Sequence, residues 1–169
     1  MFRAFYPDRY TVSAYVIDFE ELYKKGYRGL IFDIDNTLVP HGAPADDRAI
    51  RLFERLKKIG FQCCLISNNK EPRVKMFNEP IQVDYVYNAH KPSTKNYRKA
   101  MEIMGTDETN SVFIGDQLFT DVWGAKRTGI SNILVKPIHP KEEIQIVLKR
   151  YLEKIVLYFY ARSKKQAKK

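Results

Sequence analysis

Residues 29–39 read GLIFDIDNTLV, an apolar stretch typical of a buried strand that carries Asp33 and Asp35 near its end. An ionised carboxylate without a partner is strongly destabilised by burial, so two carboxylates in such a stretch require a compensating cation. Side chains alternate along a strand, which directs Asp33 and Asp35 to the same side for as long as the strand continues. Paired carboxylates suit a hard divalent ion, and Mg²⁺ is the expected cofactor.

Apolar runs and helical repeats alternate along the rest of the chain. Besides the strand at 29–34, we expect strands at 61–66, 83–87, 111–114 and 133–135, and helices at 46–59, 71–77, 91–104 and 119–128. This alternation predicts an α/β fold of three layers, with a parallel five-stranded sheet and helices on both faces. Such sheets bind ligands beyond the carboxyl ends of their strands, often where the strand order reverses.

One domain is expected, because 169 residues suffice for a single core and no low-complexity linker divides them. Its parts are a domain over 1–162, a Tyr-rich N-terminal extension at 1–27, a C-terminal amphipathic helix at 140–162 and a basic tail at 163–169. The adjacent Cys63 and Cys64 face opposite ways on a strand, so a mutual disulfide is not expected. With no secretion signal and no transmembrane stretch, we expect a cytoplasmic protein.

The net charge of +9 is concentrated at the C-terminus, where the segment from Lys136 to Lys169 holds ten Lys or Arg and three Glu. This asymmetry favours an anionic partner, either a membrane surface or a nucleic acid, although a solubilising tail explains it equally well. An apolar stripe with many aromatic residues runs along 144–159. It fits a helix on the inner face of the membrane, or a helix packed on the sheet with its basic residues outward.

Polar residues follow four of the expected strands, at the point where each strand ends. They are Asp33 with Asp35, Ser67-Asn68-Asn69, His90-Lys91 and Gly115-Asp116. The carboxyl ends of parallel strands meet at one edge of a sheet, so these residues are expected to form one site.

In this order the residues resemble the motifs of the haloacid dehalogenase-like (HAD) phosphatase superfamily. The first motif, Asp-x-Asp-x-Thr, is matched from Asp33 to Thr37, the second by Ser67, the third by Lys91-Pro92, and the fourth by Gly115-Asp116 with Asp121. The resemblance implies an enzyme, a Mg²⁺-dependent phosphatase that forms an aspartyl-phosphate intermediate.

Phosphoryl-transfer chemistry then gives each residue a role. Asp33 is expected to be the nucleophile, Asp35 the general acid and base, and Thr37 the residue that orients Asp35. The phosphoryl oxygens are expected to be bound by Ser67, Asn68 and Lys91. The expected Mg²⁺ ligands are Asp33, the backbone carbonyl of Asp35, Asp116 and, through water or in support, Asp121.

The spacing of the motifs excludes a cap domain. Only 31 residues separate Asp35 from Ser67, and 23 separate Ser67 from Lys91. An open site favours a bulky substrate that excludes water itself, or a neighbouring subunit of a homo-oligomer as lid.

The forms FDIDNTLV, ISNN, HKP and GDQLFTDV are similar to the YqeG family, a capless bacterial branch (subfamily IIIA) of the superfamily. That branch is related to phosphatidylglycerophosphate phosphatases, so the resemblance implies phosphatidylglycerophosphate as substrate and phosphatidylglycerol as product. Two alternatives stay open: a phosphatase for a nucleic-acid end, a phosphoprotein or a metabolite, and an RNA- or ribosome-associated binding protein with a vestigial site.

Overall fold

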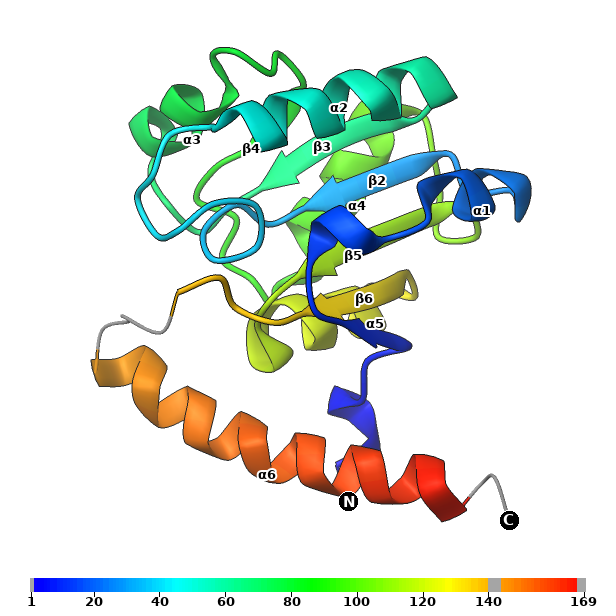
Figure 1. The fold of residues 1–169 in the computed structure, drawn as a ribbon, viewed down its shortest axis with the longest axis vertical. Coiled ribbons are helices and arrows are strands. Elements are labelled where there is room, and N and C mark those ends of the chain that lie inside the picture. The colour runs from blue at the N-terminus through cyan, green and yellow to red at the C-terminus, as the bar shows by residue number, and fades with distance from the viewer. Residues whose placement is uncertain (1, 140–143, 167–169) are drawn as a thin grey trace.

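The sheet contains six parallel strands in the order β1-β6-β5-β2-β3-β4 (Figure 1). The computed structural model of the chain describes residues 2–139 and 144–166. In chain order the strands are β1 (Arg9–Thr11), β2 (Gly29–Phe32), β3 (Gln62–Ile66), β4 (Asp84–Val86), β5 (Ser111–Gly115) and β6 (Ser131–Val135). The α/β class and the parallel sheet agree with the sequence prediction, and the number of strands differs by one.

The additional strand is β1, which comes from the Tyr-rich N-terminal extension and pairs with β6 at the edge of the sheet. The prediction of five strands missed it because β1 has only three residues, of which Arg9 and Tyr10 are exposed. An edge strand this short has neither an apolar run nor an alternating pattern by which it could be identified.

The order in which successive strands are added to the sheet reverses between β2 and β5. Strands β2, β3 and β4 follow one another towards one edge, and β5 and β6 towards the other. Phe32, the last residue of β2, lies opposite Leu65 of β3 and Ile114 of β5, so the carboxyl ends of these strands meet. This reversal is the position at which open α/β sheets bind ligands. Asp33 follows β2 directly, and its amide donates to the Ile114 carbonyl at 2.9 Å.

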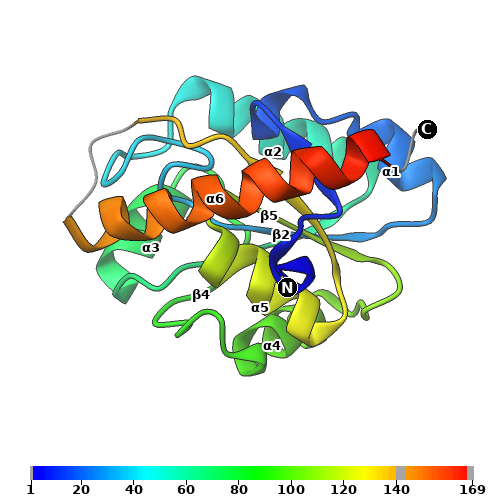
Figure 2. The same cartoon turned by 90° about the horizontal axis from the view of Figure 1, so that it is seen from below.

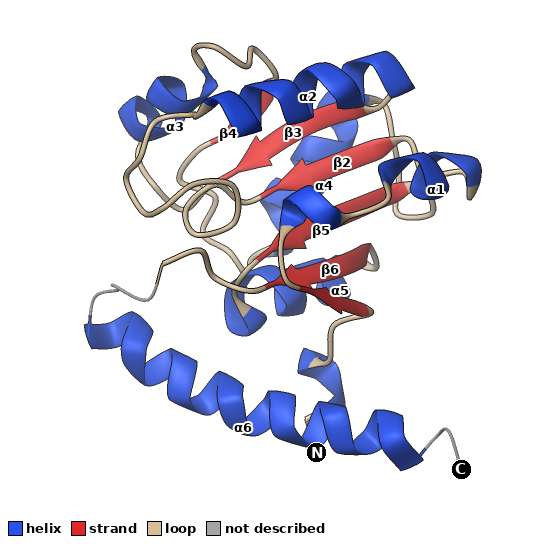
Figure 3. Ribbon diagram, viewed as in Figure 1, coloured by secondary structure: helices blue, strands red, loops and turns tan. Residues whose placement is uncertain are grey.

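Helices cover both faces of the sheet (Figure 3). One face packs against α1 (Phe19–Lys24), α2 (Asp47–Ile59) and α3 (Glu71–Asn78), and the other against α4 (Thr94–Met104) and α5 (Trp123–Thr128). Along β2, Leu30 and Phe32 belong to the first core and Ile31 to the second. The alternation of a strand thus supplies both cores, and the three-layer prediction is confirmed.

The helix ends follow local capping signals. At the start of α2 the Asp46 carboxylate accepts a hydrogen bond from the Ala49 amide at 2.8 Å, and Gly60, at φ 112°, ends the helix. The helix expected from residue 91 begins only at Thr94. The helix expected at 119–128 is divided into a π-helical turn, η3 (Leu118–Val122), and α5.

The C-terminal helix α6 (Ile144–Gln166) runs along the edge of the sheet formed by β1 and β6 (Figures 1 and 2). It continues past residue 162, where we expected its end, while positions 140–143 of the expected helix lie outside the described residues. Val156 and Leu157 pack it against a small apolar cluster that includes Leu118 and Val122 of η3.

The apolar stripe of α6 is only partly used for this packing. Tyr151, Ile155 and Tyr158 are 63%, 49% and 63% exposed, whereas Glu153 and Val156 are buried. The exposed three are spaced i, i+4 and i+7, so they share one face of the helix. Helix α6 thus has one apolar face on the domain and a second one in solvent, so the alternative of a packed helix with basic residues outward describes only part of its surface.

No inserted cap domain stands at either of the two positions where one was considered. In the fully described segment from β2 to α4, β2 and β3 are joined by α2 and its flanking loops, and β3 and α4 by α3, β4 and loops. Among the helices that the structure describes, none combines the length and the apolar character needed to cross a membrane.

Candidate active site

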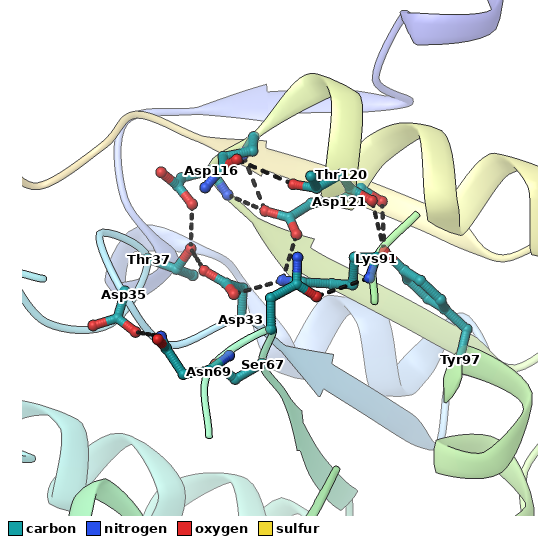
Figure 4. Close-up of polar contacts among 12 residues, drawn as sticks. Asp33, Asp35, Thr37, Ser67, Asn69, Lys91, Tyr97, Asp116, Thr120 and Asp121 are labelled. Carbon is teal, nitrogen blue, oxygen red and sulfur yellow. Dashed lines mark hydrogen bonds and ion pairs between the residues drawn. The ribbon is translucent and has the colours of Figure 1, made fainter. Parts of the chain in front are cut away.

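Side chains from four segments converge where the sheet order reverses (Figure 4). Asp33 follows β2, Asp116 follows β5, Asp121 lies in η3, and Lys91 lies in the loop before α4. All four are buried, with Lys91 the most exposed at 8%. One carboxylate oxygen of each aspartate lies within 4.8 Å of the other two. The structure thus brings together four of the residues that the sequence singled out.

Lys91 joins two of these carboxylates. Its Nζ lies 2.6 Å from Asp33 Oδ1 and 2.7 Å from Asp121 Oδ1. Burial works to lower the pKa of Lys91, but the charges of Asp121 and Asp33 outweigh it and place that pKa above its usual range. Lys91 is therefore an ammonium group, which offsets part of the negative charge in the site.

Burial and the remaining negative charge raise the pKa values of two of the carboxylates. Burial raises the pKa of Asp33 to about 6, with Lys91 opposing and Asp121 adding to the shift. Burial, followed by the charges of Asp33 and Asp121, raises the pKa of Asp116 well above its usual value. Crowded, desolvated carboxylate oxygens are the donor set that a hard divalent cation prefers, and such an ion would relieve their repulsion. The cluster therefore fits Mg²⁺.

The position of Asp121 depends on the glycine that precedes Asp116. Asp121 Oδ2 accepts hydrogen bonds from the amides of Asp116 at 3.1 Å and Gln117 at 3.0 Å. A Cβ atom on Gly115 would stand 2.5 Å from this oxygen, which is closer than side chains approach one another. The π-helical turn and the glycine together let Asp121 reach back to the end of β5.

Asp35 points away from this cluster (Figure 4). Its Oδ2 accepts from Asn69 Nδ2 at 2.7 Å, and its Oδ1 accepts from the Gly42 amide at 2.7 Å and from Arg73 Nη2 at 2.9 Å. We expected Asp33 and Asp35 to point to the same side only for as long as the strand continues, and β2 ends at Phe32, before either residue. Sequence reasoning missed Arg73, a single charged residue in a predicted helix with no motif around it.

The supporting residues also differ in part from their expected contacts. The Thr37 hydroxyl lies 3.1 Å from Asp33 Oδ2 and 3.2 Å from Asp116 Oδ1, so it orients the buried cluster. The expectation that Thr37 orients Asp35 is wrong. Ser67 is buried, and its Oγ accepts from the Asn69 amide at 3.1 Å. The side chain of Asn68 accepts from the backbone amide of Lys91 at 2.8 Å, which fixes the loop that carries the lysine.

Helix α6 also reaches the site, which the sequence did not indicate. Arg150 pairs with Asp116 Oδ2, and its Nη1 donates to the Asp116 carbonyl at 2.7 Å and to Glu153 Oε2 at 2.9 Å. Glu153 Oε1 accepts from the Leu118 amide at 2.8 Å. These contacts join the C-terminal helix to the segment that carries Asp116 and Asp121. In the sequence, Arg150 and Glu153 have the spacing of an ordinary solvated helix face.

A parallel sheet with this aspartate and lysine cluster at its reversal point is the arrangement of a HAD-type phosphatase. A family model described as HAD-hydrolase-like matches residues 88–143. The probable phosphatase YqeG of Bacillus subtilis is 38% identical over 154 residues, which are 90% of this chain and 90% of that protein. The chain therefore belongs to the YqeG family of HAD-type phosphatases.

Other similarities are more distant. The chloroplastic/mitochondrial phosphatidylglycerophosphate phosphatase 1 of Arabidopsis thaliana is 27% identical over 158 residues, or 82% of this chain and 45% of that protein, so this chain spans less than half of that relative. Among solved structures, NagD of E. coli K-12 matches with a TM-score of 0.56 at 12% identity, over 72% of this chain and 91% of that chain. The HAD-hydrolase YfnB of Bacillus subtilis, bound to magnesium, matches with a TM-score of 0.53 at 13% identity, over 70% of this chain and 91% of that chain. At such identities these structures support the fold alone.

Proposed function

We propose that this phosphatase is a Mg²⁺-dependent phosphomonoester hydrolase that works through an aspartyl-phosphate on Asp33. The observation that carries the proposal is the pairing of Asp33 with Lys91, at 2.6 Å, inside a buried acidic cluster at the reversal point of the sheet. A phosphate dianion can approach a carboxylate nucleophile only where positive charge offsets their repulsion. Lys91 supplies one such charge beside Asp33.

The reaction has two steps, each with a proton transfer at Asp35. First, a carboxylate oxygen of Asp33 attacks phosphorus, the ester P–O bond breaks, and the leaving oxygen takes a proton from Asp35. Then water gives a proton to Asp35 while its oxygen attacks phosphorus, the bond from phosphorus to Asp33 breaks, and phosphate leaves. The carboxylate of Asp33 and the protonated Asp35 are thereby restored.

The remaining residues bind and orient. Ser67 accepts a hydrogen bond from an amide through its oxygen, so its own proton is directed elsewhere and suits a phosphoryl oxygen. Lys91 and Asn68 complete the proposed phosphate site. Asp33, Asp116 and the main-chain carbonyl of Asp35 would hold Mg²⁺, with Asp121 in support. The bound ion would supply positive charge that favours both the binding of the phosphate dianion and the charge of the transition state.

Mg²⁺ is expected to be required for hydrolysis of an aryl phosphate and to stabilise the fold. At a concentration of 100 times its Kd, a ligand that binds only the folded state stabilises it by about 2.7 kcal/mol. Differential scanning fluorimetry with Mg²⁺ or with EDTA measures this shift in Tm. Asp116→Asn should lose the shift and the activity, and Asp107→Asn, which changes an exposed aspartate, should keep both. Full activity in EDTA would contradict the proposal.

Arg73→Gln is expected to lower kcat on an aryl phosphate by about 10- to 100-fold, with little change in KM. Arg73 holds the Asp35 carboxylate at 2.9 Å and does not belong to the proposed phosphate site, so its loss misplaces the proton carrier. The pH profile of kcat should change, and Arg73→Lys should restore part of the rate. Lys75→Gln, at an exposed position of the same helix, is the control. Equal kcat and pH profile in Arg73→Gln and the control would exclude this role.

Phosphatidylglycerophosphate is the proposed substrate. Support comes from the similarity to the Arabidopsis relative and from the absence of an inserted cap domain in the described segment from β2 to α4, since cap domains restrict a site to small substrates. In mixed micelles this lipid should be hydrolysed far faster than soluble phosphosugars, nucleotides, nucleic-acid ends or phosphopeptides. A panel of these substrates, tested on wild type and Asp33→Asn, measures the preference. Equal rates on all of them would exclude this lipid as the specific substrate.

An anionic membrane surface is the proposed partner of the exposed face of α6. Tyr151, Ile155 and Tyr158 on this face are accompanied by the exposed Lys149 and Lys154, which is the composition of an interfacial helix. The protein should sediment with phosphatidylglycerol vesicles and not with phosphatidylcholine vesicles, and Ile155→Glu should weaken that binding. Equal binding to both vesicles would exclude the proposal, and salt-sensitive RNA binding without phosphatase activity would favour a nucleic-acid partner instead.

A further inference from the structure

A groove of about 670 Å³ lies between α6 and the end of β6 with the loop that follows it. Among the described residues that line it is Asp116, so the groove reaches the buried acidic cluster. Tyr10 of β1 contributes to the groove at the edge of the sheet. A volume of this size is within the range of pockets that bind a small molecule.

The walls of the groove are mainly apolar. Leu134, Ile138 and Leu157 line it from β6, the following loop and α6. Three of its polar lining groups are partners of one another, since Arg150 pairs with Glu153 and with Asp116. A sugar or a base would lose hydrogen bonds to water on entering such a groove without gaining replacements, whereas an apolar chain would gain from leaving water.

Positive charge stands beside this apolar surface. Lys136 and Lys154 both line the groove and are exposed, one on each side of it, after β6 and on α6. The groove therefore combines contact with Asp116 of the acidic cluster, apolar walls, and two cations suited to an additional anion of the substrate. A small polar phosphate ester would use neither the apolar walls nor the two cations.

We propose that this groove binds the apolar chain of an amphiphilic phosphomonoester while its terminal phosphate lies at Asp33. The inference rests on the proposed function, because it assumes that phosphate is bound at Asp33. It identifies in addition the surface that selects the remainder of the substrate. Lys136 and Lys154 bind the phosphodiester that joins the apolar part to the headgroup. Helix α6 is then part of the substrate site, and its contacts to Asp116 hold one wall of the groove in place.

The test compares a lipid with its own headgroup. Dihexanoyl phosphatidylglycerophosphate, kept below its critical micelle concentration, and its deacylated form differ only in the apolar chains, and a monomeric substrate removes any effect of membrane binding. Wild type should show a kcat/KM higher by about tenfold or more for the lipid. Para-nitrophenyl phosphate, which is too small to occupy the groove, measures the basal activity.

Two groove variants and two matched controls complete the design. Two variants change the groove: Ile138→Asp puts a charge into the apolar wall, and Lys154→Glu reverses a charge at an exposed position. Each should remove most of the preference for the lipid by raising the KM for the lipid. Ile103→Asp on α4 and Lys149→Glu on α6 make the same changes outside the groove lining and should keep the preference for the lipid. Ile103→Asp should hydrolyse para-nitrophenyl phosphate at the wild-type rate, and the rate of every variant on the lipid is expressed relative to its own rate on para-nitrophenyl phosphate.

The outcomes separate the two proposals. Wild type without activity on para-nitrophenyl phosphate would overturn the proposed function, and the groove inference with it. Activity on that compound, combined with equal kcat/KM for the lipid and its deacylated form, would overturn the groove inference alone. Equal changes of the lipid rate in Lys154→Glu and Lys149→Glu would also overturn the groove inference alone. Because both lysines are exposed, this pair decides the question even if Ile138→Asp fails to fold.

Discussion

Asp33→Asn is expected to lower the turnover of para-nitrophenyl phosphate by about 10⁴-fold or more. The amide has nearly the shape of the carboxylate but is a poor nucleophile, so the aspartyl-phosphate cannot form. Stopped reactions with ³²P-labelled substrate provide a second measurement, because wild type should retain acid-stable protein-bound label during turnover and Asp33→Asn should not. Turnover near the wild-type rate would exclude Asp33 as the nucleophile.

The fold should survive this substitution. Burial has raised the pKa of Asp33 to about 6, so the ionised carboxylate is destabilised in the folded protein, and Lys91 keeps Asp121 as a partner at 2.7 Å. The Tm of Asp33→Asn in EDTA should therefore equal or exceed that of wild type. Asp84→Asn, at an exposed position of β4, makes the same chemical change and should alter neither Tm nor turnover.

What the sequence predicted well depends on local signals. The strand at 29–34 was found because its apolar run is buried on both faces, and helix α2 because Asp46 and Gly60 mark its ends. The motif residues after β2, β4 and β5 meet because all strands are parallel, which the alternation of strands and helices already implied. Topology alone therefore brought Asp33, Lys91 and Asp116 together.

What the sequence missed depends on contacts between distant segments. Arg73 and Arg150 look like solvated helix residues, and only the folded chain brings them to Asp35 and Asp116. The direction of the Thr37 hydroxyl follows from the turn after β2, which the residue pattern does not describe. The two apolar faces of α6 share one helical stripe in the sequence, so the buried one could not be distinguished from the exposed one.

Lys91→Met is expected to abolish activity and to cost about 3–5 kcal/mol of the free energy of unfolding, measured by urea denaturation in EDTA. Methionine keeps most of the volume but leaves the carboxylates of Asp33 and Asp121 buried without their ammonium partner. Stabilities of small proteins are about 5–15 kcal/mol, so this loss is a large fraction of the total. Lys95→Met, at an exposed position in the first turn of α4, is the control and should change stability by less than about 0.5 kcal/mol.

If the missing charge causes this loss, then removing one of the two unpaired carboxylates should restore part of it. Lys91→Met combined with Asp121→Asn is expected to be more stable than Lys91→Met alone by about 1–3 kcal/mol. An asparagine at this position keeps one oxygen for the amides of Asp116 and Gln117, so the turn η3 retains its hydrogen bonds. Equal stability of the single and double variants would mean that Lys91 contributes through packing and not through charge. A measurement of activity distinguishes the catalytic role of Lys91 from its role in stability. The double variant should regain stability but not turnover, because it still lacks the Lys91 ammonium group that offsets the charge of the phosphate beside Asp33.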